Sequence, residues 1–167
     1  ASDPLVKDLG WTNRIRTCYV PSTNAPGVFD PIFEFRDGAF ARLTPAGEQY
    51  WYDATGRLTK IYGSFPANYQ EMVYNERGEL VRIIDRSIPD GSRFLELGYY
   101  RMPSDPFHVA GRDSRTRSAF VAGKVARLLD YAGRAVDFEY DDDGVLKKRK
   151  GIAGNGRSEE RRVGKEC

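Results

Sequence analysis

The sequence has few of the residues that build the commonest catalytic and metal centres. It holds one histidine, His108, and two cysteines, Cys18 and Cys167, among 167 residues. Zinc sites take three or four Cys, His or acidic ligands, which this inventory does not favour. As a general base, His108 would need a partner within about 3 Å, and the sequence nominates none. We therefore predict a non-enzymatic chain without catalytic residues, cofactor or metal.

Charge of one sign and long apolar runs are also lacking. The balance of 26 Lys and Arg against 24 Asp and Glu gives a net charge of +2. The basic run at residues 147–150 follows the acidic run at 141–143 closely, and binding to a phosphate backbone needs uncompensated cations. No apolar run approaches the roughly 18 residues of a membrane-spanning helix. The sequence predicts no nucleic-acid partner and no membrane span.

Glycine, in contrast, is plentiful and regularly placed. Six stretches consist of a polar or turn-favouring residue, two more residues and a glycine, beginning at Thr44, Asp53, Asn75, Ile88, Asp130 and Asp141. At the first position of a type I turn, an Asp or Asn side chain accepts a hydrogen bond from the backbone N–H two residues on. Glycine at the fourth position takes the left-handed conformation that closes a bulged hairpin. These stretches are predicted to be hairpin corners.

The segments between these corners alternate apolar and polar residues with a period of two. In residues 136–140, Val136, Phe138 and Tyr140 alternate with two acids. Such alternation, with turns every 8–12 residues, is typical of antiparallel sheets. We therefore predict an all-β fold of antiparallel hairpins, with one strand over residues 32–43. Residues 121–129 fit either two helical turns or a strand that enters a corner, and Gly123 favours the strand.

One phrase recurs along the chain. Tyr74 follows Tyr52 by 22 residues, and Tyr140 follows Tyr74 by 66, which is three times that interval. A period in this range is expected of stacked supersecondary units. Each unit would be one hairpin, with the tyrosine as a packing residue before the corner.

The phrase Tyr-Asp-x-x-Gly-Arg resembles the signature of the RHS/YD-repeat family over roughly residues 8–150. It is intact at the first copy and altered at the later ones, and the residues that carry it are Tyr52, Asp53, Gly56, Arg57, Tyr74, Asn75, Gly78, Asp130, Gly133, Tyr140, Asp141 and Gly144. The resemblance implies hairpins joined edge to edge into a continuous, twisted sheet that spirals into a hollow shell. These residues would then be structural corners of that wall.

The resemblance also implies a role. Proteins of this family are large, secreted or exposed at the cell surface, and many enclose a toxin or effector. The chain would be a structural segment of such a shell, with the rest of the shell and the effector as partners. The alternative is a surface module that binds carbohydrate through exposed tyrosines, since aromatic rings stack on sugars.

The organisation along the chain is predicted in three parts. Residues 1–31 form a lead-in with a loop, residues 32–150 form the hairpin repeats with an irregular insertion at 101–120, and residues 151–167 form a flexible tail. Residues 157–167 resemble the translation of a sequencing-adapter oligonucleotide, codon by codon, and are excluded from the fold. Without Cys167, Cys18 has no partner for a disulfide, and it is expected to be a small apolar filler.

The acidic run at residues 141–143 partly fits the calcium-binding loop of an EF-hand. Aligned on Gly144, Glu139, Asp141 and Asp143 would take the first, third and fifth positions of a calcium loop. The twelfth position, which needs a bidentate Glu, is Lys150. The hairpin corner is therefore the better interpretation of this segment.

Overall fold

The fold is all-β, as predicted. The computed structural model describes residues 11, 13–19, 30–63, 68–88, 90–152 and 158–162, and in these residues it contains strands and turns but no helix. Consequently, no helix in the part of the chain described could span a membrane. The chain divides into two compact units, residues 1–72 with 85–89 (unit 1) and residues 73–84 with 90–167 (unit 2).

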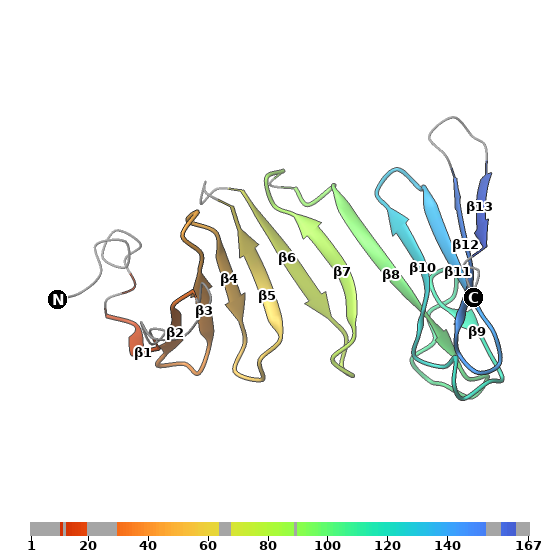
Figure 1. Ribbon diagram of the computed structural model, residues 1–167, viewed down its shortest axis with the longest axis horizontal. Coiled ribbons are helices and arrows are strands. Elements are labelled where there is room, and N and C mark those ends of the chain that lie inside the picture. Colours follow the sequence, from red (N-terminus) through yellow and green to blue (C-terminus); the bar gives the residue numbers. More distant parts are fainter. Residues whose placement is uncertain are drawn as a thin grey trace, which may run out of the picture. The chain divides into compact units, whose positions relative to one another are not determined.

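Unit 1 is an antiparallel sheet whose strands follow one another in chain order (Figure 1). Its strands are β1 (Ile15–Tyr19), β2 (Ile32–Phe35), β3 (Phe40–Leu43), β4 (Gln49–Tyr52), β5 (Leu58–Tyr62) and the first part of β6 (Tyr69–Tyr74). Each strand pairs with the next, for example Trp51 with Lys60 and Tyr62 with Tyr69. The lead-in segment therefore contributes a strand of its own, β1, paired with β2.

The single strand predicted over residues 32–43 is wrong. The chain reverses direction between β2 and β3, because Gly38 adopts φ 83° and its N–H donates to the carbonyl of Phe35 at 3.0 Å. The Asp37 carboxylate accepts a hydrogen bond from the Ala39 N–H at 3.1 Å. The dipeptide Asp37-Gly38 is a strong hairpin signal that lacks the spacing of the other corners.

One face of unit 1 carries an aromatic core. Trp11 meets the rings of Phe33 and Phe35 edge-on, with centroids 5.5 Å apart in each case. Phe35 in turn stacks on Trp51 at 4.8 Å. Ala41 and Leu43 complete the buried cluster. The apolar alternation of β2 and β3 thus places every second side chain on the face that Trp11 covers.

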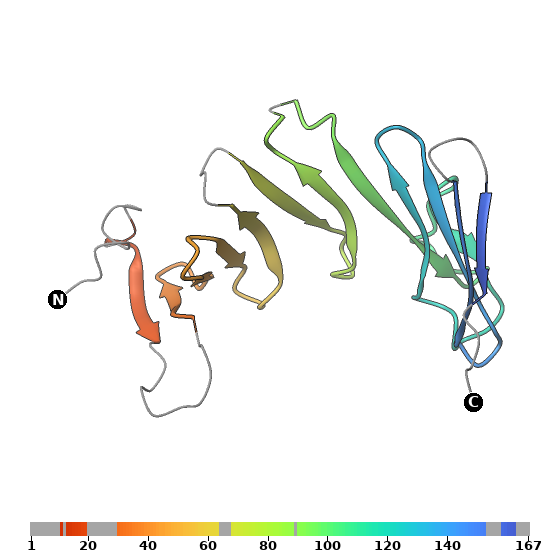
Figure 2. The same ribbon diagram turned by 45° about the horizontal axis from the view of Figure 1, so that its top comes forward.

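Unit 2 is also an antiparallel sheet in chain order, with one exception. Figure 2 shows its hairpins. Its strands are β7 (Leu80–Asp85, of which Asp85 is counted with unit 1), β8 (Phe94–Arg101), β9 (Ser114–Arg115), β10 (Val125–Asp130), β11 (Ala135–Tyr140), β12 (Leu146–Ile152) and β13 (Ser158–Arg162). The exception is β9, which pairs parallel with β8, while β10 pairs with the other edge of β8. The strand alternative for residues 121–129 is confirmed, since they include most of β10.

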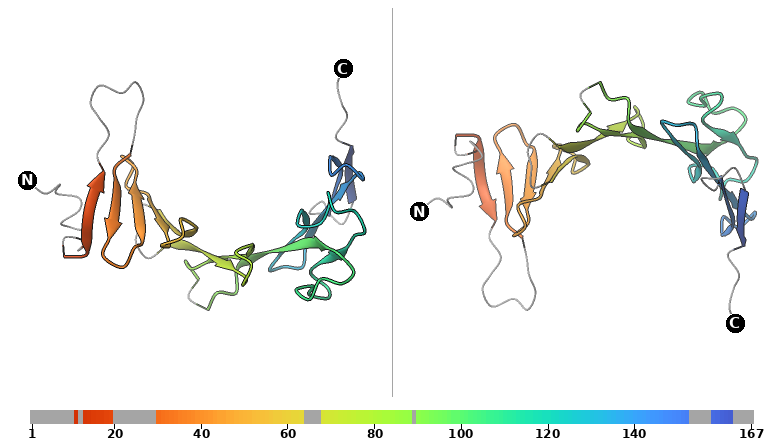
Figure 3. Two further views of the ribbon diagram at one scale, coloured as in Figure 1. Left: turned by 90° about the horizontal axis from the view of Figure 1, so that it is seen from below. Right: turned by 90° about the horizontal axis from the view of Figure 1, so that it is seen from above.

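The irregular insertion of unit 2 lies against β8, on one side of the sheet (Figure 3). Gly98 of β8 permits this approach. A Cβ atom built on Gly98 would stand 1.9 Å from the carbonyl oxygen of Arg112, so any side chain there would displace the insertion. The insertion is also tied by a backbone bond from the Thr116 N–H to the Arg101 carbonyl, at 2.8 Å.

The boundaries of the last strands differ from those predicted for the tail. Gly151 pairs with Val136, so β12 runs two residues beyond position 150. Residues 158–162 form β13, antiparallel to β12. The stretch predicted to be tail thus contains an extended segment seated on the edge of β12.

Candidate functional site

The corner that opens at Asp53 is a closed network of short-range hydrogen bonds. The Gly56 N–H donates to the Asp53 carbonyl, and the Asp53 N–H donates to the Arg57 carbonyl, both at 2.9 Å. The Asp53 carboxylate accepts from the N–H groups of Thr55 and Arg57 at 2.9 and 3.0 Å. Gly56 has φ 83°, a conformation in which a Cβ atom is strained. The sequence pattern therefore encodes a bulged hairpin turn.

The same bonds recur at the other corners that begin with Asp or Asn. At Asn75, Asp130 and Asp141 the side-chain oxygen accepts from the N–H four residues on, and the glycine three residues on donates to the first residue's carbonyl. Thr44 does the same through its hydroxyl oxygen. Tyr52, Tyr74 and Tyr140 each end the strand before such a corner. These corners thus share the same turn hydrogen bonds, and three of them follow a strand that ends in tyrosine.

The residue after the glycine explains part of the Tyr-Asp-x-x-Gly-Arg phrase. Arg57 binds the Asp53 carboxylate through Nε at 2.8 Å, and Arg134 binds Asp130 in the same way at 2.6 Å. At the Asn75 corner the direction of this hydrogen bond is reversed: the first residue, Asn75, donates through Nδ2 to the carboxylate of Glu79, the residue after the glycine, at 2.7 Å. The Thr55 hydroxyl and the Arg57 groups hold the pKa of Asp53 well below its usual range.

The stretch that begins at Ile88 is not described as one turn, because Pro89 lies outside the described residues. Gly91 does have a positive φ, of 66°. On either side, Asp85 accepts a hydrogen bond from Ser87, and Asp90 accepts one from Ser92.

The tyrosine hydroxyls bond to the backbone of neighbouring strands. Tyr140 donates to the carbonyl of Val125 at 3.0 Å, and Tyr100 donates to that of Phe138 at 2.8 Å. Burial of these rings raises the pKa of both hydroxyls. The rings themselves meet edge-on, with centroids 5.9 Å apart. Tyr140 and Tyr100 therefore link neighbouring strands of unit 2 through their hydroxyls.

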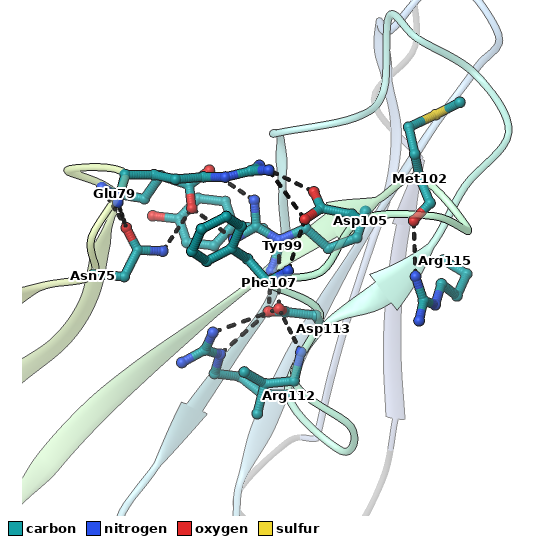
Figure 4. A network of polar contacts seen from close by, with 12 residues as sticks. Asn75, Glu79, Tyr99, Met102, Asp105, Phe107, Arg112, Asp113 and Arg115 are labelled. Atoms are coloured by element: carbon teal, nitrogen blue, oxygen red, sulfur yellow. Dashed lines mark hydrogen bonds and ion pairs between the residues drawn. The ribbon is translucent and has the colours of Figure 1, made fainter.

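The densest polar cluster of unit 2 surrounds Arg101 at the end of β8 (Figure 4). Its guanidinium donates to both carboxylate oxygens of Glu79, at 2.7 and 2.6 Å, and its Nε lies 3.4 Å from Asp113. The side chains of Arg101 and Asp113 are 1% and 0% exposed. We name these three residues the buried ion cluster. It joins the corner at Asn75 to the insertion.

Hydrogen bonds hold the acids of the buried ion cluster in their charged form. The bonds from Arg101 lower the pKa of Glu79. Burial alone would raise the pKa of Asp113, but bonds from the Arg112 side chain and from the Tyr99 and Val109 N–H groups lower it instead. Both carboxylates are therefore ionised at neutral pH, with their acceptor positions occupied by protein donors.

A second ion pair fixes the far side of the insertion. Arg77, in the Asn75 corner, binds Asp105 through two bonds of 3.0 and 3.1 Å, and its guanidinium lies 4.4 Å from the centre of the Phe107 ring. Figure 4 includes Asp105 and Phe107, and the Phe107 N–H donates to the Asp105 carboxylate at 2.9 Å. Because all these charges are mutually engaged, the cluster serves to anchor the insertion.

The sequence did not reveal the buried ion cluster. Arg101 and Asp113 fall within the predicted insertion at 101–120, and no pattern in the sequence distinguishes Glu79 from other polar residues. The only local signal is Gly98, an interruption in an otherwise apolar strand, which often marks a close backbone approach.

The remaining candidate residues are His108, Cys18 and Asp141. The His108 backbone N–H donates to the Asp105 carbonyl at 3.3 Å. Cys18 is exposed on β1, so its expected role as an apolar filler is wrong. Asp141 takes part in its hairpin corner, and no group of three or more potential metal ligands occurs among the residues described.

Comparison with known proteins adds no family name to this geometry. No protein-family model matches the chain, and no curated protein sequence matches it.

Proposed function

We propose that this chain is a non-enzymatic structural segment of an RHS/YD-type β-shell. Such a wall would help enclose or present a toxin or effector within a larger secreted or surface protein. The observation that supports this most is the repetition of one corner at Asp53, Asn75, Asp130 and Asp141. Each corner has the same turn hydrogen bonds, and apart from β9 the strands of each unit pair in chain order.

The chemistry of the corners supports a mechanical role. In each one, the Asp or Asn side chain accepts a hydrogen bond from the N–H four residues on, which helps to hold the hairpin closed. Repeat units that contact mainly their neighbours form arrays of any length. A wall built in this way needs no active centre.

The proposal can be tested by electron cryomicroscopy of the longest open reading frame that contains these residues, purified as one protein. A hollow particle whose wall includes residues 32–150 is the expected result. A solid particle without an interior, or one in which these hairpins lie outside the wall, would overturn it.

Exposed sheet edges give a second test on the chain itself. A wall segment presents unpaired strand edges, which promote association. Sedimentation velocity between 1 and 100 µM should show reversible association, weakened by Cys18→Lys on β1. The matched control is Ala132→Lys, which adds the same charge at an exposed corner. A monomer over the whole range would count against the wall.

A second candidate, a carbohydrate-binding module, is favoured by a groove in unit 1. The groove has a volume of about 470 Å³ and is lined in part by Trp51, Tyr62 and Lys60. Its aromatic rings offer flat apolar surfaces, which stack on sugar rings. Elsewhere, Tyr19 and Tyr131 are about half exposed, at 53% and 50%.

Glycan-array binding separates this candidate from the wall. Binding should fall at least tenfold in Tyr62→Ala if the groove is used, and in Tyr131→Ala if the exposed rings are used. Binding that survives both changes, or no binding at all, would reject the carbohydrate module and leave the wall proposal as it stands.

A further inference from the structure

A cavity lies on the insertion of unit 2, and arginine dominates its lining. Its volume is about 410 Å³, and it is lined by Pro103, Arg115, Thr116 and Arg117. Both arginines are exposed to solvent. Two guanidinium groups therefore border one open space, and no acid is among the described residues that line it.

The acids of the insertion are engaged elsewhere. Residues 101–120 contain two acids, Asp105 and Asp113. Asp105 binds Arg77, and Asp113 belongs to the buried ion cluster. Among the ion pairs found in the described part of the chain, none includes either arginine of the cavity. The insertion therefore has no carboxylate of its own left to neutralise these two cations.

Backbone carbonyls fix the guanidinium of Arg115. Its Nη1 donates to the carbonyl oxygens of Met102 and Pro103, both at 2.8 Å, and Figure 4 shows the first of these bonds. The side chain makes no other hydrogen bond with the residues described, so its Nη2 and Nε donors are unbonded there. Because the group is already held in place, it loses little side-chain freedom when it binds an anion.

The segment that carries Arg117 is held on both sides. Before it, the Thr116 N–H donates to the Arg101 carbonyl at 2.8 Å, and after it, the Ser118 hydroxyl donates to the Asp142 carbonyl at 2.9 Å. The Ser118 N–H also donates to the Thr116 hydroxyl oxygen at 3.1 Å. The Arg117 side chain, in contrast, makes no hydrogen bond, ion pair or ring contact with the described residues. The backbone thus presents a cation without a protein partner at the cavity.

We propose that this cavity binds the phosphate or sulfate group of a monoester. Arginine binds planar or tetrahedral anions through paired N–H donors. A carboxylate offers two oxygens, which one guanidinium satisfies, whereas a phosphate or sulfate monoester offers three terminal oxygens to two guanidinium groups. The volume of about 410 Å³ lies within the range of ligand pockets, so the organic part of the ester can lie against Pro103. The inference goes beyond the shell proposal and does not depend on it.

Calorimetric titration of the full chain tests the site with two esters, glucose 6-phosphate and glucose 6-sulfate, and with glucose as the uncharged control. At least one ester should bind about tenfold or more tightly than glucose, because hydrogen bonds to charged groups are the stronger ones. Binding should weaken in 1 M NaCl, where surface charges are screened. A response to one ester alone would support the site and identify its anion as phosphate or sulfate. Binding of neither ester, or equal binding of glucose, would overturn the proposal.

Variants then locate the bound ester. Arg117→Gln should weaken binding about tenfold, and Arg117→Lys should weaken it less, because lysine keeps the charge without the planar set of donors. Arg36→Gln is the matched control, since Arg36 is an exposed arginine of unit 1 outside the cavity. NMR amide shifts during the titration should cluster at residues 115–117. An unchanged affinity in Arg117→Gln, a similar loss in Arg36→Gln, or shifts centred on Lys60 in the groove of unit 1 would refute the site.

Discussion

The two units cover one face of their sheets with different kinds of side chain, aromatic in unit 1 and charged in unit 2. Unit 1 places Trp11 on Phe33 and Phe35, an aromatic core without buried charge among its cluster residues. Unit 2 instead lays its insertion over β8 and fixes it with Arg101 between Glu79 and Asp113. Aromatic burial tolerates small shifts, whereas a buried ion pair fails when one partner is lost. The same hairpin corners thus support two kinds of interior.

The largest expected effect is in unit 2. Arg101→Met leaves the buried Asp113 and the partly buried Glu79 without their shared cation, and removing one partner of a buried pair costs about 3–5 kcal/mol. Native-state hydrogen exchange should show this loss at the amides of Tyr99 and Thr116. Arg115→Met, at an exposed position within the same insertion, serves as the control. Unchanged exchange in Arg101→Met would mean that the insertion is held by other contacts.

The matching change in unit 1 is Phe35→Ala. Phe35 is 1% exposed and stacks on Trp51, and truncating a buried Phe costs about 3 kcal/mol or somewhat more. Both tryptophans, Trp11 and Trp51, lie in unit 1 and contact Phe35, so their fluorescence in denaturant reports this change directly. A midpoint equal to that of the unaltered chain would show that the aromatic cluster does not stabilise unit 1.

Lowering the pH should affect unit 2 before unit 1. The pKa values of Glu79 and Asp113 are depressed in the fold. Their contribution to stability is therefore complete above the ordinary carboxyl pKa of about 4, and it is lost as the pH falls through their folded values. Between pH 5 and 2, NMR shifts of the Tyr99 and Arg101 amides should change before those of Phe35 and Ala41. Simultaneous change in both units would contradict this order.

A corner common to both units should respond in the same way in each. Gly56→Val places a β-branched residue at φ 83° and should cost about 1–2 kcal/mol, and Gly133→Val should cost a similar amount at φ 76°. Neither Cβ atom meets another atom within 4 Å, so the cost is conformational. Denaturant titrations with Gly56→Asn as the milder comparison would measure it. A neutral valine would disprove the left-handed corner.

The smallest effect is expected at the ion pair of the first corner. Arg57→Ala removes a partner of Asp53 that is 42% exposed, and such pairs contribute less than about 0.5 kcal/mol. Asp53 keeps its bonds from the Thr55 N–H and hydroxyl. A loss above 1 kcal/mol in thermal melts would show that the Arg of the repeated phrase is a principal stabilising residue.

Local chemistry explains which parts of the fold were predictable. The corners at Asp53, Asn75, Asp130 and Asp141 depend on side chains within five residues, so the sequence displays them directly. The turn between Phe35 and Ala39 was missed because Asp37-Gly38 lies outside the regular spacing. The parallel strand β9 and the buried ion cluster depend on residues more than ten positions apart, such as Arg101 and Glu79. No periodicity marks such contacts.

The short range of the corner bonds has a consequence for how the chain folds. Every bond described for the Asp53 corner joins residues at most four positions apart, so the turn can close before distant strands are present. Hairpins form in about 1–10 µs, whereas synthesis adds only about 5–20 residues per second. Each hairpin therefore has ample time to form as it emerges from the ribosome, and the growing sheet offers its newest strand as the template for the next.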